Sequence, residues 1–214
     1  MGLAVSLGVL ASDSDADPDG IEWFRQRFLQ VNRVLAAHGL PPHEEPECLP
    51  DLPYRGQPLG FPYSWLHYLR RAVAFARQAP DRFCPVAEGE NPANDERVDE
   101  ELSAVMDSHL ICHSDCEGFY VPIDFPVPLY DDQEEEGLPG GILGSSQRAL
   151  QEILKAASLL GIPLVEGNLS DDAAKNIAEE PDGSHLYWIE RKVWLTMFEA
   201  FRHSIEYKCA VVFG

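Results

Sequence analysis

The sequence predicts an α+β fold: a small, mainly antiparallel sheet packed against several helices, in one domain spanning residues 1–214. A chain of 214 residues with 45% hydrophobic residues has enough apolar material for a continuous core. Apolar residues recur at helical spacing in several segments, whereas two short β-prone runs lie close enough for a hairpin. That hairpin interrupts strict strand and helix alternation, so a doubly wound parallel sheet is the weaker alternative.

The first elements follow from local signals. Leu3, Val5, Leu7 and Val9 alternate with other residues at the period of a strand, and the polar run 12–17 ends it. Asp17 can cap a helix that begins at Pro18 and that Gly39 terminates. Seven prolines in residues 40–62 exclude regular structure there, and apolar residues between them predict a loop that adheres to the domain.

The later helices are predicted from apolar stripes and capping residues. The stripes lie at 65–76, at 98–106 with Asn94 as the cap, and at 150–160 with Ser145 or Ser146 as the cap. A shorter helix is predicted after Ser170, and the last helix is predicted at 186–204. The closing run 209–213 is apolar throughout, which is typical of a central strand.

The central part of the chain predicts the hairpin and one surface loop. Runs 109–113 and 119–125 are β-prone and are joined by residues 114–118. Pro122 cannot donate a ladder hydrogen bond, so the second strand should lie at a sheet edge or carry a bulge. The glycine-rich segment 137–146 is interpreted as a mobile surface loop that leads into a serine-capped helix.

Charge is the most informative part of the composition. The 36 acidic and 16 basic residues give a formal net charge of −20. Such a field repels phosphate backbones and anionic lipids and attracts basic proteins. We therefore expect a basic protein partner, no nucleic acid and no membrane, although acidity can also serve solubility alone. The oligomeric state stays open.

Cysteine usage and hydropathy indicate the compartment. The five cysteines are odd in number and mostly far apart, so we interpret them as free thiols. Residues 1–10 lack the basic start of a signal peptide, and no apolar run approaches the roughly 20 residues of a membrane span. We expect a soluble protein of the cytoplasm.

The cluster Cys112, His113, Asp115 and Cys116 is the first candidate for chemistry. Thiolates and imidazole bind zinc, and a thiol beside a base can act as a nucleophile. A second ligand pair, an orienting group and an oxyanion hole are all missing from the sequence, so we expect no metal, no cofactor and no catalytic residue. A metal- or thiol-dependent enzyme centred on this turn is the alternative. In the structural interpretation, Cys112 points into the core while Ser114 and Asp115 bond backbone amides.

The acidic run at residues 131–136 is the second candidate binding site. Its order does not match a calcium-binding EF-hand loop, but it can meet a basic protein surface or simply be solvated. The binding residues that the sequence nominates are therefore the turn and this run: His113, Ser114, Asp115, Cys116, Glu117, Asp131, Asp132, Glu134, Glu135 and Glu136.

Residues 109–122 (HLICHSDCEGFYVP) and 209–214 (CAVVFG) carry a resemblance. The His-Ser-Asp-x-Glu-Gly turn and the terminal apolar strand look like bacterial immunity proteins of polymorphic toxin systems. The resemblance implies a non-enzymatic protein that binds and neutralises a cognate toxin, and an acidic surface suits a basic nuclease toxin.

Overall fold

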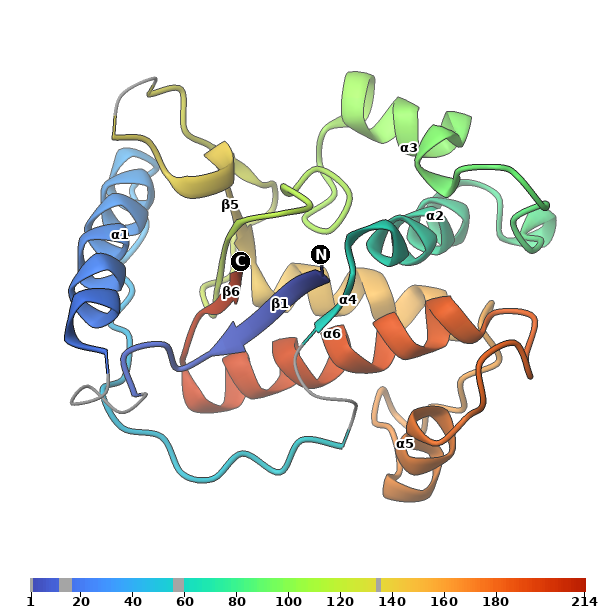
Figure 1. The fold of residues 1–214 in the computed structure, drawn as a ribbon. Helices are drawn as coiled ribbons and strands as arrows, with labels where there is room; N and C mark the ends of the chain where they lie inside the picture. Colours follow the sequence, from blue (N-terminus) through green and yellow to red (C-terminus); the bar gives the residue numbers. More distant parts are fainter. Residues whose placement is uncertain (1, 12–16, 56–59, 134–135) are drawn as a thin grey trace.

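The computed structural model describes residues 2–11, 17–55, 60–133 and 136–214 and has the predicted α+β architecture (Figure 1). Its strands are β1 (Gly2–Leu7), β2 (Gly60–Pro62), β3 (Gly118–Val121), β4 (Leu129–Tyr130), β5 (Ile142–Ser145) and β6 (Val211–Phe213). They form one sheet in the order β2-β1-β6-β3-β5-β4. Each described pair is antiparallel except β3 with β5, so the sheet is mostly antiparallel, as expected.

The main helices of the described chain are α1 (Pro18–Ala37), α2 (Tyr63–Gln78), α3 (Glu96–Glu100), α4 (Ser146–Ala156), α5 (Asp171–Ala178) and α6 (Trp188–Tyr207). The π-helix η3 (Glu101–Val105) continues α3 without a break. Short 3₁₀ turns lie at η1 (Pro80–Arg82), η2 (Pro92–Asn94) and η4 (Pro139–Gly141). None of the helices in these described segments has the length and apolarity needed to cross a bilayer.

Most helix starts follow the predicted capping chemistry. Asp17 accepts a hydrogen bond from Gly20 N at 3.0 Å and Pro18 is the first helical residue, as the sequence indicated. The prediction that Asn94 caps the third helix was wrong. Asp95 is the cap because its side chain accepts from Arg97 N at 3.0 Å, and Asn94 ends η2.

The sheet is covered on both faces. On one face, Tyr120, Val211 and Phe213 join the core formed with α2, α4 and α6. On the other face, Phe119 and Val212 pack against α1. Figure 1 shows α1 on one side of the strands, with α4 and α6 on the other. The alternation within β3 and β6 places successive side chains in different cores, which explains why both strands are buried throughout.

The predicted hairpin is wrong. Residues 109–113 form a turn followed by a bend, because the buried carboxylate of Glu152 accepts from His109 N at 2.7 Å and Leu110 N at 3.0 Å. Those amides are unavailable to a strand. β3 therefore pairs with β6 and β5 and lies inside the sheet, not at its edge. Pro122 follows the last residue of β3, so its missing donor disturbs no ladder bond.

Two further expectations change in the second half of the chain. The glycine-rich segment is not a surface loop throughout, since its residues 142–145 are strand β5, paired in parallel with β3. The helix predicted at 186–204 begins at Trp188, and burial extends round most of it, including Glu190, Arg191, Glu199 and His203. The predicted central position of the terminal strand β6 is confirmed.

The described part of the proline-rich segment adheres to α6, as expected. Tyr54 donates its hydroxyl hydrogen to the Thr196 carbonyl at 3.0 Å. The Arg55 guanidinium contacts Glu199 at 2.7 Å. The segment therefore contributes polar anchors to the core helix, and not only covering surface.

Candidate partner-binding surface

The His113 side chain is a structural element of the 113–118 turn. Its ring is 3% exposed and stacks on Tyr120 with 4.1 Å between centroids. Its nitrogens lie 3.0 and 3.1 Å from the carbonyl oxygens of Ser114 and Phe119. Burial lowers the pKa of His113 to about 4. A buried imidazole engaged with backbone carbonyls is not placed to activate the Cys116 thiol.

The other nominated residues of the turn divide into anchors and exposed groups. Ser114 Oγ accepts from the amides of Cys116 and Glu117 at 3.4 Å, the local bonding expected of it. Asp115 instead contacts His67 at 3.3 Å, a longer-range partner. Cys116 and Glu117 are exposed. Within the described residues, no three His, Cys, Asp or Glu side chains converge as a metal site.

The acidic run is only partly a solvated surface. The Asp131 side chain is 6% exposed, lies 2.6 Å from Arg33 and accepts from Leu138 N at 2.7 Å. Asp131 therefore anchors the run to α1. Asp132 and Glu136 are exposed, and the nominated residues 134–135 lie outside the described residues.

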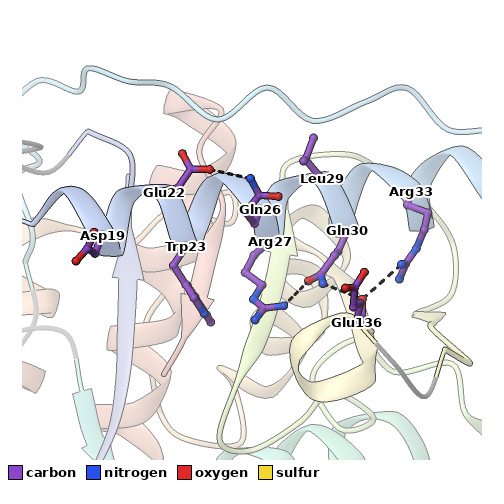
Figure 2. A pocket seen from close by; sticks show the side chains of 9 residues that line it. All are labelled: Asp19, Glu22, Trp23, Gln26, Arg27, Leu29, Gln30, Arg33 and Glu136. Atoms are coloured by element: carbon purple, nitrogen blue, oxygen red, sulfur yellow. Dashed lines mark hydrogen bonds between the residues drawn. The ribbon is translucent and has the colours of Figure 1, made fainter.

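A groove of about 650 Å³ runs along the outer face of α1 beside Glu136 (Figure 2). Its polar groups bond to one another: Gln26 donates to Glu22 at 2.7 Å, and Gln30 donates to the Glu136 carbonyl at 2.7 Å. Trp23 and Leu29 remain 46% and 63% exposed. Both acidic and basic side chains line this groove, so it does not select a ligand of one charge.

In the described chain, carboxylates are more often exposed at the surface than basic side chains are. Among the described residues, five exposed residues carry basic side chains and 22 carry carboxylates. The five are Arg25, Arg82, Lys155, Lys175 and Lys208. The surface is therefore more acidic than the composition alone indicates.

Three arginines, Arg70, Arg71 and Arg191, are buried and held by tertiary contacts. Arg70 is 5% exposed and donates to the carbonyls of Leu110 and His113 at 3.0 and 2.5 Å. Arg191 is likewise buried and lies 3.1 Å from Glu180. These contacts hold the guanidinium groups of Arg70 and Arg191 away from solvent. Some exposed carboxylates still pair with basic side chains, such as Asp124 with Arg148 and Asp171 with Arg55.

The segment 96–107, made of α3, η3 and the two residues after them, was missed as a site. Its apolar residues were predicted to be one stripe, but only Val98 is buried, at 2% exposure. Leu102, Val105 and Met106 are 46%, 44% and 42% exposed. Glu96, Asp99 and Glu100 are exposed beside them. The mixture of acids and apolar residues at 96–106 is the sequence signal that could have found this surface.

Comparison with known proteins relates this acidic surface to DNA. A family model described as "Putative DNA-mimic protein" matches residues 1–213. The expectation of no nucleic acid was therefore wrong, because a mimic takes the place of DNA on a protein that binds DNA. The expectations of a basic protein partner and of a binding role agree with the family description. No curated protein and no solved structure shows significant similarity. Since the match covers nearly the whole chain, this protein belongs to the family of DNA-mimic proteins so described.

Proposed function

We propose that this protein mimics DNA: it occupies the DNA-binding surface of a basic protein and thereby excludes DNA from that surface. The observation that carries the proposal is the separation of charge by depth, with exposed carboxylates outnumbering exposed basic side chains in the described chain. The family description supports the same role.

The physical basis is that carboxylates and phosphates are bound by the same groups. Lysine and arginine side chains that contact DNA phosphates form charge-assisted hydrogen bonds with carboxylates as well. Because Arg70 is held inside by its contact with Leu110 and Arg191 by its contact with Glu180, these two arginines do not compete with the partner's basic groups. Such a partner acts where DNA is handled, so we place the protein in the cytoplasm.

The direct test is competition between this protein and duplex DNA. Proteins from the native host are bound to the immobilised chain and eluted with duplex DNA, with polyglutamate at equal charge as the control. We expect DNA-binding proteins to elute with DNA, and each purified partner to lose labelled DNA when this protein is added. A ternary complex of protein, partner and DNA would contradict the proposal, because mimicry requires a shared surface.

The narrower proposal of an immunity protein names one such partner, a cognate toxin that acts on DNA. It is supported by the resemblance at residues 109–122 and by the acidic surface. The experiment is to co-express the chain with the product of the neighbouring gene. Restored growth of cells that express that product supports immunity, whereas unchanged toxicity leaves DNA mimicry with another partner.

A further inference from the structure

The 96–107 segment has its polarity inverted relative to an ordinary surface helix. Glu101 is 2% exposed, whereas its neighbour Leu102 is 46% exposed. Burying a carboxylate while exposing aliphatic side chains is the reverse of what burial favours in an isolated domain. Contiguous exposed apolar residues with a polar rim are typical of a protein interface.

The inner side of the segment is held firmly by α2 and the α3 cap. Arg77 contacts Glu101 at 2.9 Å and also pairs with Asp107. Arg71 contacts Asp95 at 2.9 Å. The Arg97 guanidinium lies 4.2 Å from the centroid of the Phe75 ring. Arg97 also lies 3.3 Å from the outer carboxylate of Glu96. The outer side therefore presents carboxylates, one of them paired with Arg97, and apolar residues in a preorganised arrangement.

The outer side combines acidic and apolar side chains. Leu102 and Val105 lie in η3 and Met106 is its left-handed C-cap, where Tyr130 donates its hydroxyl hydrogen to the Met106 carbonyl at 3.4 Å and so places β4 beside this end. Glu96 and Glu100 are four residues apart in α3, hence about 6 Å along the helix axis. Figure 1 shows α3 and its continuation beyond α2, at the side of the molecule away from α6.

We infer that the outer side of 96–107 docks a basic protein that presents an apolar contact between lysine or arginine side chains. The carboxylates complement the partner's positive charge, and Leu102, Val105 and Met106 form the part of the interface that loses water. The inference deepens the proposed function and rests on it for the sign of the partner's charge. DNA has no such apolar groups in its phosphate backbone, so this contact adds affinity for proteins that simple phosphate mimicry does not supply.

The probes are two synthetic helical peptides of equal length and equal lysine content. One carries leucine on the face opposite the lysines and the other carries serine. We expect the lysine–leucine peptide to bind the full chain roughly tenfold more tightly. On its binding, hydrogen exchange should slow most within 96–107. Equal affinity of the two peptides, or protection centred elsewhere, would overturn the inference.

Matched variants separate local docking from overall charge. One triple variant combines Glu96→Gln, Asp99→Asn and Glu100→Gln, and its control combines Glu166→Gln, Asp172→Asn and Glu179→Gln, all at exposed positions. Both change the net charge equally. We expect the first to weaken peptide binding by roughly tenfold and the control by less than about twofold. Equal losses would overturn the inference but leave DNA mimicry intact, whereas failure to compete with DNA at all would contradict the proposed function instead.

An apolar pair tests the second component of the surface. The variant Leu102→Ala with Val105→Ala removes exposed groups from the segment, and Val165→Ala with Leu186→Ala removes groups that are 74% and 75% exposed elsewhere. Since each pair is exposed, neither should change the unfolding midpoint appreciably. We expect only the first pair to abolish the preference for the leucine-containing peptide. An unchanged preference would overturn the apolar part of the inference.

Discussion

Two buried glutamates on α6 experience opposite environments. Burial alone would raise the pKa of Glu199, but hydrogen bonds from His203, Arg55 and Arg202 lower that pKa to about 2. Burial raises the pKa of Glu190 to about 7, with only weak compensation from its own backbone amide and Arg71. The two side chains are fully buried and 3% exposed, respectively.

These directions predict opposite effects of removing each charge. The lowered pKa means that ionised Glu199 stabilises the fold above its unfolded pKa, and that this contribution of roughly 3 kcal/mol is lost as pH falls from about 4.5 to about 2. The raised pKa means that ionisation of Glu190 destabilises the fold increasingly as pH rises from about 4.5 to about 7. Glu199→Gln should therefore destabilise the protein at about pH 8, and Glu190→Gln should stabilise it.

Urea unfolding across this pH range measures both effects. The difference between the wild type and Glu199→Gln should shrink toward pH 2, where the wild-type carboxylate takes up its proton. The difference for Glu190→Gln should vanish below about pH 4. Parallel stability curves for the three proteins would contradict these assignments.

The cysteines give a second residue-scale prediction, which addresses the thiol-enzyme alternative. Cys48, Cys84 and Cys116 are exposed, whereas Cys112 and Cys209 are buried. Burial raises the pKa of Cys112 and raises that of Cys209 to about 12. We expect a disulfide reagent to modify the three exposed thiols at rates typical of ordinary surface cysteines and the two buried thiols only on unfolding. Unusually fast modification of Cys112 or Cys116 would revive a thiol-dependent activity.

At the element scale, the 113–118 turn is expected to act through packing. Gly118 has φ +127°, and a Cβ there would lie 2.8 Å from the His113 ring. Gly89 has φ +84° but nothing within 4 Å of such a Cβ, so it serves as the matched control. Gly89→Ala should cost about 1 kcal/mol from backbone strain, and Gly118→Ala about 2 kcal/mol or more. Equal losses of unfolding free energy would show that the ring contact contributes nothing.

The sequence predicted elements whose signals are local and missed those set by distant partners. The α1 start was found because Asp17 and Pro18 are adjacent to the helix they begin. The hairpin failed because Glu152, more than forty residues away, takes the amides of residues 109–110. Likewise, the excess of acid was visible in the composition, but the excess of carboxylates among exposed residues depends on which arginines tertiary contacts bury.

At the scale of the whole molecule, this chain and DNA carry negative charge at different densities. B-DNA holds one charge per ~1.7 Å of its axis and a condensed layer of counterions that basic proteins release. This chain distributes a formal charge of −20, which already counts its basic residues, over an accessible surface of 10661 Å². It therefore should release fewer condensed ions on binding than DNA does.

The resulting prediction is that competition with DNA improves as salt rises. DNA affinity for a shared basic partner falls steeply between about 50 mM and about 200 mM salt, whereas binding of this chain should weaken mainly through screening and retain its apolar contribution. Anisotropy titrations of labelled DNA on that partner, with this protein as competitor at each salt concentration, measure the ratio of the two dissociation constants. The ratio should shift toward this protein by roughly tenfold over that range. A constant ratio would mean that the chain reproduces the polyelectrolyte behaviour of DNA, so that the arrangement of its carboxylates, and not its apolar surface, dominates recognition.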